Sequence, residues 1–214
     1  MLLKRIAKAI LPTRSQQHLK TLIGKRRVRR VLDEMQASGQ AVRIEIGSGP
    51  VARRNGLITV DLHTQADIPW DLRFPLPFTD NSASLVYSSH VMEHFYYHDL
   101  VVLLKHCLRV LRPGGVYSAC VPDASIYVRS YCDSSPLDSS YLDYRLAYIS
   151  DKKMDVINYI AYSGDGHKYM FDEENLVRVL GVAGFTSVRI RPFDPSLDLA
   201  ERRQGSIYVE GVKP

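Results

Sequence analysis

The sequence predicts an α/β protein built on a mostly parallel β-sheet. Short apolar runs recur between residues 41 and 122, and a segment with helical periodicity joins the last two of them. A strand, a helix and a strand in this order form a parallel pair with a right-handed crossover. The 214 residues are 45% hydrophobic and 24% charged, which is typical of a globular protein with one domain, or one domain plus an appendage.

Four runs predict the strands of this sheet, and one longer segment predicts the crossover helix. The strands are expected over residues 41–47, 56–62, 83–89 and 114–122, all rich in apolar and β-branched residues. Between the last two, residues 98–115 place leucine and valine at three- and four-residue steps, which predicts an amphipathic helix. The sequence Pro113-Gly114-Gly115 is expected to end that helix.

The character of the chain changes after Asp123. Residues 124–170 contain eight of the thirteen tyrosines, and residues 141–162 have few turn-forming residues, which predicts a helix there. Because the segment is too long for a simple loop, we expect an inserted, tyrosine-rich helical lid. Residues 172–185 predict a helix with Asp172 as its N-cap and Gly184 just past its end. Two closing strands are expected over 186–193 and 205–212, joined by a polar loop.

The positive charge of the protein belongs to its N-terminal 40 residues. Residues 1–40 carry ten Lys and Arg against two acids, a net of +8, whereas the rest carries 18 bases and 21 acids, a net of −3. We therefore expect a basic arm (1–40) followed by a single globular domain (41–214), and no nucleic-acid partner for the domain. Apolar residues over 2–11 recur at helical spacing opposite basic ones, and a second helix is expected over 24–35.

Two interpretations of the arm stay open: a helix within residues 1–30 that lies on an anionic membrane surface, or a packing arm. No apolar run reaches the roughly 18 residues of a membrane span, so we expect a cytoplasmic protein. In the first interpretation of the arm, the protein binds peripherally to the inner face of the membrane. Three cysteines, Cys107, Cys120 and Cys132, form an odd set without metal-ligand spacing. They predict reduced thiols and no metal site.

Two glycines and an aspartate at the ends of the first two predicted strands indicate a ligand site. Gly47, Gly49 and Ala52 fit the spacing of the dinucleotide fingerprint. That fingerprint needs a long helix after the turn and an acid about 20 residues on. Here residues 50–55 alone separate the turn from the next strand, and Asp61 follows Gly47 by 14 positions. The spacing favours a nucleoside without a pyrophosphate.

Such a ligand needs a turn without side chains, a carboxylate for its ribose hydroxyls and an apolar slot for its base. Gly47 and Gly49 meet the first need, since a Cβ there would occupy the ligand's space, and Asp61 meets the second. Residues 66–78 predict the slot, with Asp71 near the adenine amino group and Leu72 against the ring.

Five segments resemble the class I S-adenosylmethionine-dependent methyltransferases over about residues 41–212. They are "EIGSGP" (45–50), "VDL" (60–62), "DLRFPLPFTDNSASLVYSSHVMEHF" (71–95), "CLRVLRPGGVYSACVPD" (107–123) and "HKYMFDEENLVRVLGVAGF" (167–185), the last typical of the type 11 branch. The short link between the first two strands resembles a predicted bacterial branch. The resemblance implies a Rossmann-like seven-stranded sheet of order 3-2-1-4-5-7-6, with the last strand antiparallel and helices on both faces.

The resemblance also implies the cofactor and its site. S-adenosylmethionine would lie over the carboxyl ends of the parallel strands, where open α/β sheets bind ligands. The residues expected to contact it are Glu45, Gly47, Ser48, Gly49, Asp61, Leu62, Asp71, Leu72, Ser88, Ser89 and His90.

The expected activity is methyl transfer to a small molecule or a glycan precursor, on oxygen. Because sulfonium already activates the methyl group, alignment does much of the catalysis, and a histidine base assists a hydroxyl acceptor. The catalytic candidates are His94, His167 and Asp123; each has a structural alternative, as a wall residue or as the cap of the lid's first helix. The alternative function is a non-catalytic cofactor- or partner-binding protein, motivated by Pro50 in place of the usual third glycine.

Overall fold

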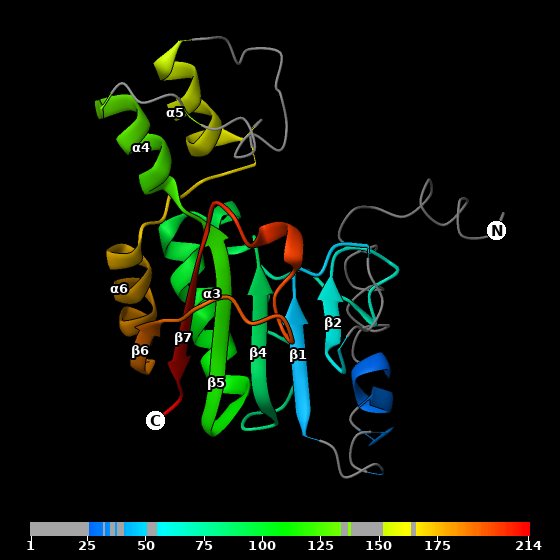
Figure 1. Cartoon of the computed structure of the whole chain (residues 1–214). Helices are drawn as coiled ribbons and strands as arrows, with labels where there is room; N and C mark the ends of the chain where they lie inside the picture. The colour runs from blue at the N-terminus through cyan, green and yellow to red at the C-terminus, as the bar shows by residue number, and fades with distance from the viewer. Residues whose placement is uncertain are drawn as a thin grey trace, which may run out of the picture.

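A seven-stranded sheet forms the centre of the computed structural model, which describes residues 26–31, 33, 34, 37, 41–50, 55–133, 137, 152–163 and 166–214. The strand order is β3-β2-β1-β4-β5-β7-β6 (Figure 1). Only β7 runs antiparallel to its neighbours, β5 and β6. The predicted order and the antiparallel last strand are therefore confirmed. The strands are β1 (Val42–Ile46), β2 (Ile58–Asp61), β3 (Ile68–Pro69), β4 (Ala83–Ser89), β5 (Leu111–Pro122), β6 (Thr186–Ile190) and β7 (Ser206–Val212).

Alternating side chains give the sheet two apolar faces. On one face, Ile44, Val86 and Tyr117 belong to the main hydrophobic core. The helices α3 (Tyr97–Val110) and α6 (Glu173–Ala183) cover this face, and Figure 1 shows α3 behind the sheet. Residues of the same helix face recur every three or four positions, so Leu100, Leu104 and their neighbours are buried together.

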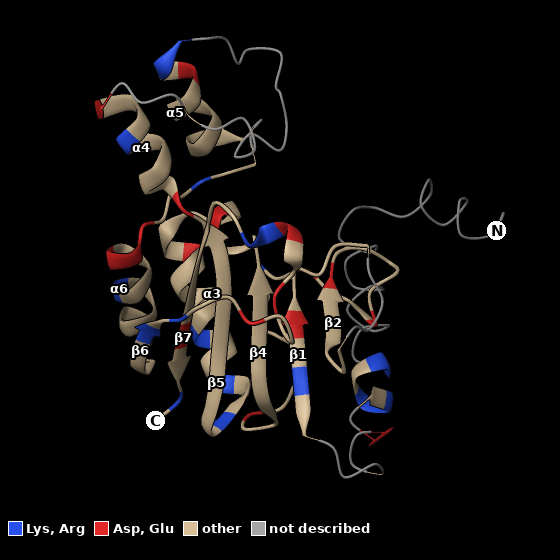
Figure 2. Cartoon of the chain, in the orientation of Figure 1, with Lys and Arg blue, Asp and Glu red and all other residues tan. Residues whose placement is uncertain are grey.

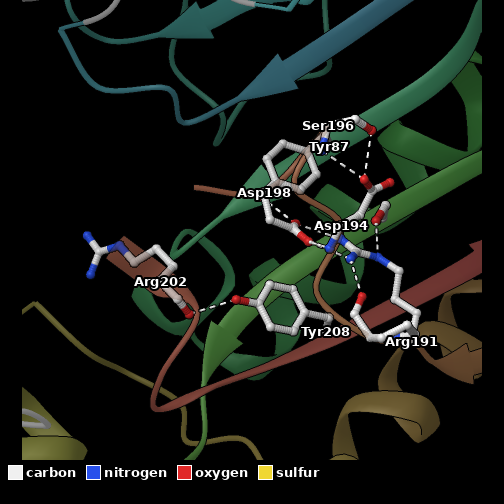
Figure 3. A network of polar contacts seen from close by, with 9 residues as sticks. Tyr87, Arg191, Asp194, Ser196, Asp198, Arg202 and Tyr208 are labelled. Atoms are coloured by element: carbon white, nitrogen blue, oxygen red, sulfur yellow. Dashed lines mark hydrogen bonds and ion pairs between the residues drawn. The ribbon is translucent and has the colours of Figure 1, made fainter. Parts of the chain in front are cut away.

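The connection between β6 and β7 covers the opposite face of the sheet. It crosses in front of the strands in Figure 1 and contains the short helix η3 (Ala200–Arg202). Leu197 of this connection packs with Leu57 and Tyr87 in a separate apolar cluster. Its Asp198 accepts hydrogen bonds from Tyr87 Oη (3.0 Å) and Arg191 Nη1 (2.6 Å), as drawn in Figure 3. These contacts hold the connection against this face of the sheet.

The ends of two helices test the sequence predictions. The predicted N-cap and C-terminal glycine of α6 are confirmed: Asp172 accepts a hydrogen bond from Asn175 N, and Gly184 is left-handed at φ 106°. The crossover helix α3 ends at Val110, just before the predicted stop signal Pro113-Gly114-Gly115, and β5 begins directly at Leu111. Proline disfavours helical geometry in the residue before it, so Pro113 ends the helix upstream of itself.

Two helices form the described part of the tyrosine-rich segment. These are α4 (Ala124–Asp133) and α5 (Lys153–Tyr162), and Figure 1 shows them beyond the carboxyl ends of the strands. They pack on each other, with the rings of Tyr127 and Tyr159 centred 6.0 Å apart. At their base, Asp123 forms an isolated parallel bridge with Phe171. Residues 141–151 of the helix predicted over 141–162 lie outside the described residues.

The described part of the basic arm is a short helix beside the sheet. Residues 26–31 are helical, and Val28 and Val31 are buried in the main core. Arg27 Nη1 donates to the carbonyl oxygens of Ala66 (3.3 Å) and Asp67 (3.4 Å). The helix predicted over 2–11 lies outside the described residues.

Two further properties bear on the sequence predictions. Within the described ranges, no helix is long and apolar enough to cross a bilayer. Cys107 and Cys120 are buried free thiols, and Cys132 is an exposed one.

Candidate functional site

A glycine turn follows β1 at the carboxyl edge of the sheet, where Figure 2 shows acidic positions at the upper ends of β1 and β2. Gly47 and Gly49 both have left-handed backbone, at φ 69° and φ 68°. Gly47 N donates to Val60 O at 2.7 Å, which fixes the turn against β2. A Cβ on Gly47 would lie 2.3 Å from Val91 Cγ2, inside any permitted contact. The turn therefore requires glycine at position 47.

Asp61 connects this turn to the end of β2. Its Oδ2 accepts a hydrogen bond from Gly49 N (2.9 Å), and its Oδ1 accepts one from His63 N (2.8 Å). A carboxylate has about four acceptor positions, so these two bonds leave further lone pairs for the hydroxyls of a ligand. Asp61 thus both shapes the turn and remains able to bind.

A cavity of about 610 Å³ opens at this turn, and we call it the cofactor cavity. Its size falls within the range of small-molecule sites. It unites residues from the turn, the ends of β2 and β4, the segment after β3, and the start of α3. Its lining consists of Gly47, Gly49, Asp61, Leu62, Asp71, Leu72, Arg73, His90, Val91, His94, Phe95, Tyr96, Asp99 and Lys168.

Seven of the residues expected to contact the cofactor line this cavity. They are Gly47, Gly49, Asp61, Leu62, Asp71, Leu72 and His90. Asp71 already has an ion-pair partner in the protein. Arg73 Nε donates to its Oδ1 at 3.0 Å, and Arg73 Nη2 pairs with its Oδ2 at 2.5 Å.

Four expected cofactor residues do not line the cavity. Glu45 is 3% exposed and lies opposite Tyr87 in the strand register. Ser88 is fully buried, with its hydroxyl 2.8 Å from Tyr117 Oη. Ser89 Oγ is buried too, and Ser48 Oγ donates to Gly49 O at 3.4 Å. Side chains in a strand point alternately to the two faces of the sheet. The two serines at the end of β4 therefore lie near the carboxyl edge without pointing into the cavity beyond it.

Six lining residues were not expected from the sequence. Most flank η1 (Met92–His94) or begin α3, and the set is Arg73, Val91, Phe95, Tyr96, Asp99 and Lys168. The apolar members follow the predicted third strand within a few residues, which is the signal that was available. Lys168, near the end of the lid segment, lies 75 positions after Glu93 and is held there because its N donates to Glu93 O at 2.7 Å.

A second cavity of about 270 Å³ lies between the lid, the end of β5 and the β6–β7 connection, and we call it the acceptor cavity. Its lining consists of His90, Glu93, His94, Pro122, Tyr127, Tyr159, Ile160, Ser163, His167, Glu201, Arg202, Gln204, Gly205 and Ser206. His90 and His94 therefore line both cavities.

His90 and Glu93 form the buried part of this shared wall. His90 has left-handed backbone at φ 52°, and its Nε2 lies 3.0 Å from Ser206 Oγ. Burial, with the nearby Arg202 charge, lowers the pKa of His90 to about 3, so its ring is neutral. Burial raises the pKa of Glu93 to about 8. Neither carboxyl oxygen of Glu93 has a hydrogen-bond partner among the described residues.

The two catalytic candidates His94 and His167 meet across the lid's return to the sheet. Their ring centroids are 5.3 Å apart in an edge-to-face arrangement. His94 Nδ1 lies 2.9 Å from Gly166 O, and His167 Nδ1 lies 2.8 Å from Ile160 O. Burial lowers the pKa of His167. The structure thus brings together two histidines that are 73 positions apart in the sequence.

Asp123, the third catalytic candidate, lies at the base of the lid and lines neither cavity. Its Oδ1 accepts a hydrogen bond from Ser125 N at 2.9 Å, at the start of α4. This geometry is that of the structural alternative, a helix cap. Pro50 is exposed and lines neither cavity.

The β6–β7 connection supplies acceptor-cavity residues that were not expected from the sequence. Glu201, Arg202 and Gln204 come from it, and Ser206 begins β7. From the sequence alone, residues 192–205 are predicted only as a polar joining loop. A signal was available in the implied strand order: β6 is parallel to β5, so the chain leaving β6 emerges at the ligand-binding edge.

This strand order, with a glycine turn and a nearby acid at the carboxyl edge, defines a Rossmann-like methyltransferase fold. Residues 24–119 match the type 11 family of methyltransferase domains. Over these residues the chain has a methyltransferase domain, and the fold matches that of S-adenosylmethionine-dependent methyltransferases. A search of curated proteins found no match.

Solved structures share the fold at low sequence identity. One is a SAM-dependent methyltransferase from Thermotoga maritima, described as a possible histamine N-methyltransferase; it is 16% identical, with 94% of this chain and 96% of that chain covered and a TM-score of 0.50. Another is a SAM-dependent methyltransferase from Archaeoglobus fulgidus; it is 17% identical, with 90% and 94% covered and a TM-score of 0.50. At these identities the likeness shows the fold.

The cofactor of this family is S-adenosylmethionine, and the cofactor cavity fits it. Gly47 keeps a side chain out of the turn, Asp61 would offer acceptors to ribose hydroxyls, and Leu72 would offer an apolar surface to the base. No phosphate-binding helix follows the turn within residues 47–50 and 55–57, in keeping with a ligand that carries no phosphate.

Proposed function

We propose that this protein transfers the methyl group of S-adenosylmethionine to a hydroxyl of a small molecule or glycan precursor. The cofactor would occupy the cofactor cavity, and the acceptor would enter the acceptor cavity beneath the lid. The observation that carries the proposal is the wall the two cavities share, formed by His90 and His94. In-line displacement needs donor and acceptor on a common line, and a shared wall supports such an arrangement.

The acceptor cavity suits a compact, polar, ring-bearing group. Its volume of about 270 Å³ lies just below the range of typical ligand pockets, so it suits one ring better than a whole oligomer. Tyr127 and Tyr159 provide ring faces, while Arg202 and Gln204 provide donors. We assign residues 124–170 to this acceptor-binding lid within a transferase unit of residues 41–214. A closed lid would also exclude water from the transfer.

Proton removal falls to the histidines in this proposal. A carbonyl oxygen only accepts, so Nδ1 of both His94 and His167 carries the proton and Nε2 keeps its lone pair. An acceptor hydroxyl that reaches Nε2 of either ring would lose its proton there. The oxygen would then attack the methyl carbon as the carbon–sulfur bond breaks and its electron pair returns to sulfur.

Calorimetric titration with S-adenosylmethionine tests the first half of this proposal. We expect saturable binding of one molecule per chain, and no binding at millimolar cofactor would overturn it. Tritiated methyl transfer into fractionated cell lysate tests the second half. A protein that binds the cofactor but labels no fraction would support the alternative function, a non-catalytic cofactor-binding protein.

The histidines are tested by His94→Ala and His167→Ala. We expect at least one variant to lose tenfold or more of the labelling rate while its cofactor affinity stays within about threefold, since a base typically contributes 10²- to 10⁴-fold. His98→Ala is the control, because His98 is exposed and lines neither cavity. Normal turnover in both variants would leave alignment alone as the mechanism.

A further inference from the structure

Three side chains of metal-binding type converge on the acceptor cavity. Glu93 and His94 come from η1, and His167 comes from the lid's return. One possible ligand atom from each residue lies within 4.8 Å of the other two. Atoms bound to one tetrahedral zinc ion at roughly 2.1 Å are about 3.4 Å apart. Side-chain rotations that shorten these separations by up to about 1.4 Å would therefore place all three on one ion.

The hydrogen bonds of the two histidines orient them as ligands. His94 Nδ1 donates to Gly166 O (2.9 Å) and His167 Nδ1 donates to Ile160 O (2.8 Å), which leaves Nε2 with the free lone pair in both rings. Metal-binding histidines almost always donate their other ring N–H to a carbonyl or carboxylate in this way. The close approach of Gly166 to His94 depends on glycine, since a Cβ there would lie 3.3 Å from His94 Cε1.

Glu93 provides an independent observation. It is 2% exposed, and both carboxyl oxygens lack a hydrogen-bond partner in the described part of the chain. The nearest ring nitrogen, His90 Nδ1, is 3.6 Å from Oε1, which is too long for a hydrogen bond. Buried carboxylates are normally paired, hydrogen-bonded or bound to a metal. A bound cation would supply the partner that this carboxyl group lacks among the described residues.

We propose that Glu93, His94 and His167 bind one divalent transition-metal ion at the wall between the two cavities. Two imidazoles and one carboxylate are a ligand set of catalytic zinc and of non-haem iron, and both leave positions open. The open positions would face the acceptor cavity, which all three residues line. The positive charge of Arg202 in the same lining would disfavour a cation, and the negative charge of Glu201 would offset this effect.

The catalytic consequence rests on the proposed methyl transfer. An acceptor hydroxyl on an open position would lose its proton to water more readily, because the ion stabilises the oxygen anion. The oxygen lone pair then forms the bond to the methyl carbon, and the carbon–sulfur electron pair returns to sulfur. With the ion bound, the Nε2 atoms are ligands, so the proton leaves to solvent, and the ion replaces the histidine base of the metal-free protein.

Titration with Co²⁺ tests the site in the full-length, untagged protein after chelation. Visible absorption reports the ligand geometry and calorimetry reports the affinity, both in the absence of cofactor and acceptor. We expect one ion per chain in the wild type. Glu93→Gln, His94→Ala and His167→Ala should each weaken binding at least tenfold. His98→Ala, with an exposed histidine elsewhere, should bind as the wild type does.

Glu93→Gln is the decisive variant. The two histidines alone, capturing cobalt adventitiously, would bind equally well in Glu93→Gln, and this result would overturn the proposal, as would the absence of saturable binding. Cofactor titration and thermal melting of each variant check its folding. If Glu93→Gln melts early, Glu93→Met, of similar volume and uncharged, takes its place. If the wild type binds the cofactor but no metal, only the proposed metal site is overturned. If it binds metal but no cofactor, only the proposed function is overturned.

Discussion

Three residues that line the cofactor cavity have left-handed backbone. Gly47, Gly49 and His90 all have positive φ, at 69°, 68° and 52°, and all three line it. For glycine this costs little, but for His90 the conformation costs about 1–2 kcal/mol. Strained residues of this kind cluster at functional sites, where the surrounding structure holds them. The bond from His90 N to Cys120 O, at 2.9 Å, supplies part of that support.

Gly47→Ala and Gly49→Ala should differ in stability. Both place alanine at positive φ, which costs about 1–2 kcal/mol. Only position 47 adds overlap with Val91, and overpacking costs roughly a further 1–3 kcal/mol. A Cβ at 49 meets nothing within 4 Å, so it enters the space of the cofactor. Denaturant unfolding should rank Gly47→Ala as less stable, while calorimetry should show weaker cofactor binding in both.

The pair Gly47→Ala/Val91→Ala separates the two causes at position 47. The double variant should regain the stability lost to steric overlap with Val91 but not the stability lost to the positive φ of alanine. The stability change of Val91→Ala alone is subtracted first. Equal destabilisation by Gly47→Ala and Gly49→Ala would show that the contact with Val91 relaxes freely.

Asp61→Ala should weaken cofactor binding tenfold or more. Hydrogen bonds to a charged group are worth about 1.5–3 kcal/mol each, and the change removes the acceptors for ribose. Because Asp61 also holds Gly49 N and His63 N, a modest loss of thermal stability should accompany the loss of affinity. Glu174→Ala, an exposed acid on α6, is the control. Calorimetry with S-adenosylmethionine decides, and unchanged affinity would remove Asp61 from the site.

At the scale of elements, a buried ion pair fastens the β6–β7 connection to the sheet. The side chains of Arg191 and Asp198 are 9% and 0% exposed, and Figure 3 shows them beside Tyr87 and Asp194. Arg191 Nε also donates to Ser118 Oγ of β5 at 2.9 Å. The same connection carries Arg202 and Gln204 into the acceptor cavity. The ion pair is therefore expected to position the cavity wall.

Asp198→Ala should cost roughly 3–5 kcal/mol of unfolding free energy, because it leaves the Arg191 guanidinium buried without its partner. Arg191→Met/Asp198→Leu should recover most of this loss, since no charge stays buried. The neighbouring pair Arg189–Glu210 is the control: the Arg189 side chain is 72% exposed, so Arg189→Met should cost less than about 1 kcal/mol. Additive losses across the Arg191–Asp198 cycle would contradict the expected coupling.

Elements with local signals could be predicted from the sequence. The strand over 83–89 has the predicted bounds, and α6 has the predicted caps at Asp172 and Gly184. β3, with two residues, is too short for any periodicity to reveal. Gly47 and Asp61 could be proposed because a turn and a strand end constrain them locally.

The remaining site residues depend on contacts between distant parts of the chain. Arg202 reaches the acceptor cavity only because β6 lies parallel to β5 at the far side of the sheet. The cluster of Glu93, His94 and His167 forms only when the lid's return bonds to Glu93 O. Ser88 shows the reverse effect: adjacency in the sequence suggested a ligand contact, whereas strand alternation turned the side chain toward Tyr117.

At the scale of the whole molecule, the two cavities differ in the parts of the protein that line them: the described helices of the lid contribute to the acceptor cavity and not to the cofactor cavity. No residue of α4 or α5 lines the cofactor cavity, whereas Tyr127, Tyr159 and Ile160 line the acceptor cavity. The described helices of the lid pack mainly on each other and form their own apolar cluster. Cofactor binding should therefore be separable from acceptor binding.

Replacing residues 126–162 with a short Gly-Ser linker should leave cofactor affinity within about threefold of wild type, because every described lining residue of the cofactor cavity remains. Labelling of the lysate fraction that the wild type methylates should fall below a tenth, since the acceptor loses Tyr127 and Tyr159 and His167 loses its bond to Ile160 O. Calorimetry and tritium transfer measure the two effects on the same preparation. Retained labelling would place the acceptor outside the lid, and lost cofactor binding would show that the lid supports the sheet edge.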